Sequence, residues 1–234
     1  MPELDRSVDL ASERVLALSD PFRSLLPEGV RRGSTVTVTG SMALAMAVTA
    51  GLAGDAGGDH WVAGVGWGPR AGLMAAHELG VPWERLVLVA APDDRRGWAT
   101  VVSVVVDAFD VVVVVVHPGV GATGTTARRL AARARERGTV VIVVEGPDQR
   151  LSGHLAPEVA LRVVDGRWEG VGRGHGRLRA RRVVVEASGR GRLVRPRRAT
   201  LWLPAPDGGV RLADETPPAT FGDGPVSPVL GEAG

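Results

Sequence analysis

A chain of 234 residues that is 44% hydrophobic and 23% charged has enough apolar side chain for one full core, which excludes wholesale disorder. The chain contains no Cys and no Lys, so disulfide scaffolds, thiolate metal sites, thiol nucleophiles and Schiff-base enzymes are excluded, and all 28 basic residues are Arg. The formal net charge is only +2, and the N-terminus is acidic where a signal peptide would be basic. No apolar run approaches the roughly 20 residues that a membrane helix needs. We therefore predict a cytoplasmic protein without membrane contact.

Strand and helix patterns alternate through the first 146 residues. The expected strands lie at 34–39, 61–65, 86–90, 111–116 and 139–144. The expected helices lie at 11–18, 42–52, 71–79 and 98–109, and one more starts at Thr125 or Thr126 and stops at Gly138. The unbroken valine run at 111–116 is typical of a central parallel strand that is buried on both faces. The alternation predicts an α/β fold with a mostly parallel sheet flanked by helices.

The pattern changes in the last third of the chain. Strand patterns follow one another at 159–164, 178–186 and 199–203 with no helix between them, which predicts an antiparallel extension of the sheet. From Pro204 onward Pro, Gly and acidic residues dominate, and we expect a disordered tail. The predicted organisation is an N-terminal helical segment at 1–24, a core at 25–203 and a tail at 204–234.

The loop after the first core strand is the natural phosphate site of such a fold. A phosphate-binding loop has the pattern G-x-x-x-x-G-K-[ST], in which Lys supplies the cation and the hydroxyl holds the metal ion. Gly40 is present here, but Ala45 stands at the second glycine, Met46 at the lysine and Ala47 at the hydroxyl. The loop therefore predicts helix packing and no bound nucleotide cofactor.

No other stretch carries a clear catalytic pattern. His117 follows the fourth strand, at the edge where such sheets bind ligands, although a structural role is the commoner one for a lone histidine. Gly64–Gly68 and Gly170–Gly176 are glycine-rich but do not open a helix as a dinucleotide-binding fingerprint does. The five His are scattered and no Ser–His–Asp set stands out, so no catalytic residue and no metal ligand are predicted.

Positive charge is concentrated in one segment. Residues 162–198 hold 12 Arg against three acidic residues, whereas the remainder of the chain is acidic. The candidate residues for contact with DNA or a partner protein are Arg173, Arg177, Arg179, Arg181, Arg182, Arg195, Arg197 and Arg198. On a strand, Arg177, Arg179 and Arg181 share one face and can follow a phosphate backbone, and Trp168 is placed to stack on bases. The alternative is that these arginines are solvated charges balanced by the acidic remainder.

The order of elements resembles the core of RecA-type recombinases over roughly residues 25–203. Leu26–Gly29 looks like the turn before that family's phosphate loop, and Glu78–Val81 looks like the helix end after its second strand. Arg182–Glu186 and Ala199–Leu203 resemble the paired late strands that follow its DNA-binding loops. The resemblance implies a RecA-like core, but the family's functional residues do not carry over, since the region of its catalytic glutamate also lacks a carboxylate.

A RecA-like core of this length with a degenerate loop, arginine as the sole basic residue and the segment Trp168–Arg179 looks most like the ImuA-type proteins of actinobacteria. The resemblance implies a non-catalytic scaffold in a DNA-damage-induced (SOS) complex for mutagenic translesion synthesis. Its partners would be a polymerase-like adaptor of the ImuB type, RecA and single-stranded DNA. Two alternatives stay open: a SulA-like cell-division inhibitor that binds a tubulin-like polymer, and a RecA-like NTPase in which Arg70 or Arg128 replaces the missing lysine. The arginine segment favours the first reading.

Overall fold

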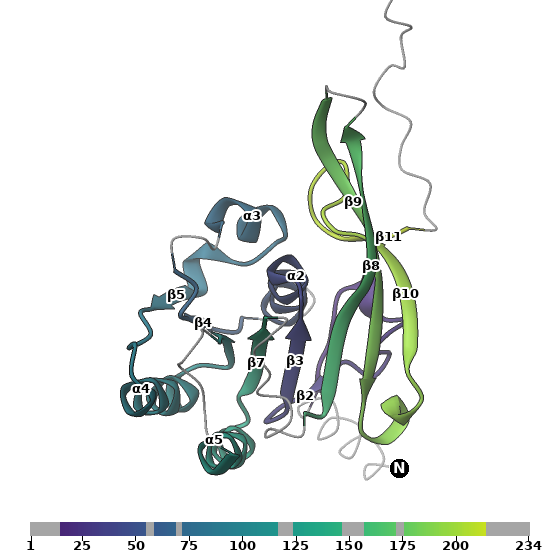
Figure 1. Cartoon of the computed structure of the whole chain (residues 1–234). Coiled ribbons are helices and arrows are strands. Elements are labelled where there is room, and N and C mark those ends of the chain that lie inside the picture. The colour runs from purple at the N-terminus through teal and green to yellow at the C-terminus, as the bar shows by residue number, and fades with distance from the viewer. Residues whose placement is uncertain are drawn as a thin grey trace, which may run out of the picture.

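The computed structural model describes residues 15–54, 59–68, 72–116, 124–146, 157–171 and 176–213 (Figure 1). The strands are β1 (Val15–Leu16), β2 (Val30–Arg31), β3 (Thr35–Thr39), β4 (Val62–Val65), β5 (Leu86–Val89), β6 (Val111–Val115), β7 (Val140–Glu145), β8 (Val159–Val171), β9 (Gly176–Gly189), β10 (Arg197–Trp202) and β11 (Arg211–Leu212). The α-helices are α2 (Met42–Ala53), α3 (Leu73–Glu78), α4 (Arg95–Ala108) and α5 (Gly124–Arg137). The 3-10 turns are η1 (Asp20–Phe22), η2 (Trp83–Arg85) and η3 (Gly191–Val194).

One sheet organises the molecule. Its strand order is β11-β10-β9-β8-β3-β7-β6-β4-β5. The pairs from β8 across to β5 are parallel, and the pairs from β8 across to β11 are antiparallel. The predicted α/β class, with a mostly parallel sheet and an antiparallel extension, is therefore confirmed. β1 and β2 form a separate two-stranded sheet.

Helices cover both faces of the parallel part, which explains its valine-rich strands. Val111 and Val113 pack with α2 and α3 in one core cluster, whereas Val112 and Val114 pack with α4 and α5 in another. Figure 1 shows these helix pairs on opposite sides of the sheet. Because alternate residues of a strand face opposite sides, a strand between two helix layers needs apolar side chains at every position.

Two of the helices begin where a polar side chain caps them. Ser41 accepts a hydrogen bond from the N–H of Leu44 at 3.1 Å, and Asp94 accepts one from the N–H of Gly97 at 2.8 Å. Asp94 therefore starts α4 a turn earlier than the start predicted at residue 98. α5 begins at Gly124, so Thr125 and Thr126 lie inside its first turn instead of at its cap.

The predicted N-terminal helix at 11–18 is wrong over the residues that the structure describes. Val15–Leu16 is strand β1, which pairs antiparallel with β2, and residues 11–14 lie outside the described part. Leu16 and Leu18 are both buried and Ala17 is exposed, which is the two-residue period of an extended chain. Within residues 15–24, the described part of the predicted N-terminal helical segment, the helical structure is the short turn η1.

The predicted start of the tail at residue 204 is also wrong. Ala205 is buried, and β11 pairs with β10. The N–H of Ala213 donates to the carbonyl of Thr200 at 2.9 Å, and Leu212 packs against the core. The folded unit therefore includes residues 204–213, because a few apolar side chains are enough to hold a polar segment on a sheet edge. Residues 214–234 lie outside the described part.

Gly64, in the middle of β4, makes room for a buried tryptophan. A Cβ at this position would lie 2.6–2.8 Å from atoms of the Trp67 ring, whose Nε1 donates to the carbonyl of Val113 at 3.3 Å. We expect Gly64→Ala to destabilise the fold by about 1–3 kcal/mol, because Trp67 must move within a packed core. Urea unfolding measures this loss. Gly146→Ala, where an added Cβ meets nothing within 4 Å, is the matched control, and equal losses in both variants would contradict this account of Gly64.

Candidate functional site

The first loop connects β3 to α2 and lies where a phosphate would bind. Gly40 adopts a φ of +81°, and its N–H donates to the carbonyl of Glu145 at 3.2 Å. The side chains of Ala45, Met46 and Ala47 are between 0% and 3% exposed and belong to the main core cluster. The positions that would carry a lysine and a hydroxyl in a phosphate loop are thus filled by apolar side chains packed into the core.

A buried carboxylate lies beside this loop. Glu145 is the last residue of β7, it stands opposite Thr39 in the pairing with β3, and it is 2% exposed. An ionised carboxylate at this edge would repel a phosphate group. The sequence analysis did not single out Glu145, although an acid that closes the buried run Val140–Val144 was a visible signal.

The other residues considered for a nucleotide site do not complete one in the described structure. Arg128 is exposed on α5. Arg70 and His117 lie outside the described residues, and so does Arg173 of the arginine segment. No group of three or more His, Cys, Asp or Glu within the described ranges could hold a metal ion.

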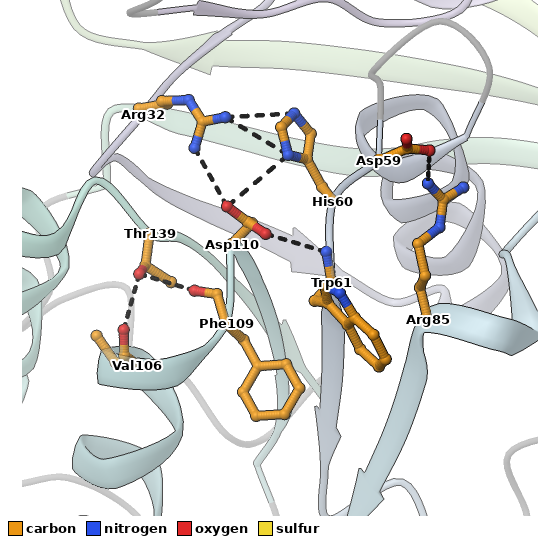
Figure 2. Close-up of polar contacts among 9 residues, drawn as sticks. All are labelled: Arg32, Asp59, His60, Trp61, Arg85, Val106, Phe109, Asp110 and Thr139. Carbon is orange, nitrogen blue, oxygen red and sulfur yellow. Dashed lines mark hydrogen bonds and ion pairs between the residues drawn. The ribbon is translucent and has the colours of Figure 1, made fainter.

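A polar cluster lies at the opposite, amino-terminal edge of the sheet (Figure 2). A carboxylate oxygen of Asp110 lies 3.4 Å from the Arg32 guanidinium and 3.8 Å from the His60 ring, and the other accepts the N–H of Trp61 at 3.0 Å. The hydroxyl of Thr139 donates within the same edge to a carbonyl at the end of α4 at 2.7 Å. Because these contacts join residues next to the starts of β4, β6 and β7, we assign them the structural role of fixing where those strands begin.

The arginine segment forms a long hairpin. β8 and β9 pair antiparallel and extend past the parallel part of the sheet, as Figure 1 shows. Arg177, Arg179 and Arg181 lie at alternate positions of β9, but the ladder with β8 is irregular between Ala180 and Gly176, so Arg181 is in regular register across the strand pair and Arg177 and Arg179 lie within the irregularity. Trp168 stands opposite Arg181, and the guanidinium carbon lies 5.7 Å from the centre of the indole ring, a cation–π contact. Trp168 remains 44% exposed.

Two of the candidate arginines, Arg182 and Arg198, lie on the other face of the extension. Glu186 forms ion pairs with Arg198 at 2.7 Å and with Arg162 at 3.0 Å. Hydrogen bonds from Arg198 and Arg162 hold the pKa of Glu186 below its usual value. Arg198 is thereby neutralised locally, whereas Arg182 stands opposite Arg167 with no acidic residue across the strand pair.

The last two candidates lie at the far end of the hairpin from its tip. Arg195 is exposed after η3. Arg197 pairs with Ala187, whose side chain is fully buried on the inner face, so Arg197 also points to the inner side and lines a groove there. The candidate arginines that the structure describes therefore occupy three places, and three of them, which we call the arginine row, follow one another along the first half of β9: Arg177, Arg179 and Arg181.

These features define an α/β protein in which core packing occupies the position of a nucleotide loop and an arginine-bearing hairpin extends the sheet. Residues 24–150 match the family model described as the MT3502 N-terminal domain, and the chain belongs to this family. It is similar to the uncharacterized protein Rv3395c of Mycobacterium tuberculosis (strain ATCC 25618 / H37Rv), with 31% identity over 197 residues, which cover 81% of this chain and 92% of that protein. Among the described residues, no helix is both long and apolar enough to cross a membrane.

Proposed function

We propose that this protein is a non-catalytic, RecA-like accessory protein of the ImuA type, which serves as a scaffold in a DNA-damage-induced translesion synthesis complex. The observation that carries the proposal is the burial of Ala45, Met46 and Ala47 in the core, where a nucleotide-binding relative would carry its cation and metal ligand. The sheet supports it as well, because a parallel core with late antiparallel strands is the arrangement that the resemblance implies.

Loss of the nucleotide site changes how such a core can work. A nucleotide switch depends on the terminal phosphate, whose contacts hold one conformation until hydrolysis. Without it the core keeps one conformation, and its partners are recognised by fixed surfaces. We propose a polymerase-like adaptor as the main partner and single-stranded DNA as a second ligand.

The arginine row of β9 is the surface that we assign to DNA. Residues two apart on a strand lie about 6.8 Å from each other, which is close to the distance between neighbouring phosphates along an extended single strand. Arg177, Arg179 and Arg181 therefore suit a run of successive phosphates. Trp168 shares this face through its pairing with Arg181, and its exposed ring offers a stacking surface for a base.

Charge removal on the row tests this assignment. We expect the wild-type chain to bind a fluorescein-labelled oligothymidylate with an affinity that falls as salt rises. The triple variant Arg177→Ala/Arg179→Ala/Arg181→Ala should lose about tenfold or more and show a salt slope smaller by about two, since each lost phosphate contact contributes roughly 0.7. Fluorescence polarisation over a range of salt concentrations measures both effects.

A matched variant separates the row from net charge alone. Arg128→Ala/Arg129→Ala/Arg135→Ala removes the same charge from exposed positions of α5. Equal loss in both triple variants, or binding that does not respond to salt, would contradict a specific role for the row. Co-purification with a division-ring protein in place of a polymerase-like adaptor, together with no DNA binding, would favour the SulA-like alternative.

A further inference from the structure

A groove of about 650 Å³ lies at the amino-terminal edge of the sheet, away from both the first loop and the tip of the hairpin. The Leu26–Gly29 turn forms one wall and η3 forms the other. Leu25, Leu26 and Val159, which are 0%, 4% and 7% exposed, provide an apolar floor. The volume falls in the range of roughly 300–1,000 Å³ that is usual for ligand sites.

Strand pairing directs arginines into this groove. Arg31 follows the buried Val30 in β2 and pairs with Val15 of β1. Its side chain is exposed and lines the groove. Arg197 shares the inner face with the buried Ala187 and is itself half-buried. Arg190 is held just before η3 by a hydrogen bond from its N–H to the carbonyl of Glu158 at 3.1 Å.

The charges in the groove do not balance. Four arginines and two glutamates line it: Arg31, Arg190, Arg192, Arg197, Glu28 and Glu158. Glu28 and Arg192 form an ion pair at 2.6 Å between the turn and η3. Within the described residues, no carboxylate lies within ion-pair distance of Arg31, Arg190 or Arg197. An excess of guanidinium groups therefore surrounds an apolar floor.

We propose that this groove binds an acidic peptide segment of a partner protein, with an apolar side chain on the floor and carboxylates against Arg31 and Arg197. Guanidinium groups pair with carboxylates through two parallel hydrogen bonds, which suits fixed arginines on either side of an apolar contact. A peptide fits better than a single-stranded nucleic acid because the described residues that line the groove include no aromatic side chain on which a base could stack. The site is independent of the function proposed for the β9 row.

Peptide binding to the full chain tests the proposal. The probe is a short fluorescein-labelled peptide of alternating Glu and Leu, followed by polarisation at low and moderate salt. We expect saturable binding that weakens with salt, at least tenfold weaker binding to Arg31→Ala/Arg197→Ala, and several-fold weaker binding to Leu193→Ala, which thins the apolar lining. Arg135→Ala, an exposed arginine on α5, is the matched control and should bind as the wild type does.

Three outcomes would overturn the proposal. The first is equal binding of a peptide in which Lys replaces Glu, and the second is unchanged binding by the arginine double variant. The third is binding that appears only in the full-length variant Asp214→Asn/Glu215→Gln, which would identify the chain's own acidic residues after Ala213 as the occupant. Melting curves of each variant show that it is folded, and loss of binding with an unchanged melting temperature supports the groove as the site.

Discussion

Met46→Lys, which puts a cation at the lysine position of the first loop, is expected to lower the free energy of unfolding by about 3–5 kcal/mol. Met46 is 3% exposed and belongs to the core cluster, so an ammonium group there would be buried without a partner. Urea unfolding measures the loss. Met74→Lys is the matched control, because Met74 is 63% exposed on α3 and the same substitution there should change stability by less than about 0.5 kcal/mol.

The same variant also tests whether the loop retains a phosphate site. If Met46 only fills space in the core, ATP with magnesium should leave the melting temperature of both the wild type and Met46→Lys unchanged. A ligand at 100 times its dissociation constant would stabilise the folded state by about 2.7 kcal/mol, which a melting curve detects easily. A rise of that size in the wild type would overturn the scaffold proposal, and a rise in the variant alone would show that the loop geometry is intact and lacks only its cation.

A chain that ends at Pro204 is expected to melt about 5–15 °C below a chain that ends at Ala213. The difference between the two truncations is the segment 205–213, which holds the buried Ala205 and strand β11 with Leu212 on the core. Burial of these side chains contributes a few kcal/mol, and for a chain of this size each kcal/mol moves the melting temperature by about 2–4 °C. Differential scanning calorimetry of the two proteins measures it.

The pair of truncations also locates the boundary of the folded unit. Both proteins lack residues 214–234, so that segment does not enter the comparison. Identical melting temperatures would mean that β11 contributes nothing and that the boundary predicted at residue 203 was right. A protein ending at Ala213 that aggregates would place essential packing still further along the chain.

The parallel core was predictable because its signals are local. Valine runs mark strands buried between two helix layers, and Gly or a capping residue marks most of the helix ends. The helix start at Asp94 was missed because a capping aspartate followed by two arginines does not continue the apolar pattern of the helix, although its side chain caps the first turn. The N-terminal strand was missed because the apolar residues of 11–18 fit both the helical period of 3.6 and the strand period of two. Only the pairing of β1 with β2 decides between the two structures.

The candidate sites were less predictable because they depend on strand register. Alternation along β9 predicted one face for Arg177, Arg179 and Arg181, but it could not foresee the irregular pairing between Ala180 and Gly176. On β10, neighbouring residues face opposite sides in any register, but only the register shows that Arg198 lies beside Glu186 and that Arg197 faces inward with Ala187. The groove is lined by residues from four separate parts of the chain. A local sequence pattern does not predict that residues so far apart in the chain lie side by side.

Strand β9 of the hairpin has exposed positions near its tip and buried positions at its base. From Gly176 to Arg179 its side chains are exposed, whereas Val183, Val185 and Ala187 of the same strand are fully buried. Substitutions near the tip are therefore expected to change the exposed surface at little cost to folding, whereas substitutions at the base are expected to lower the stability of the whole sheet.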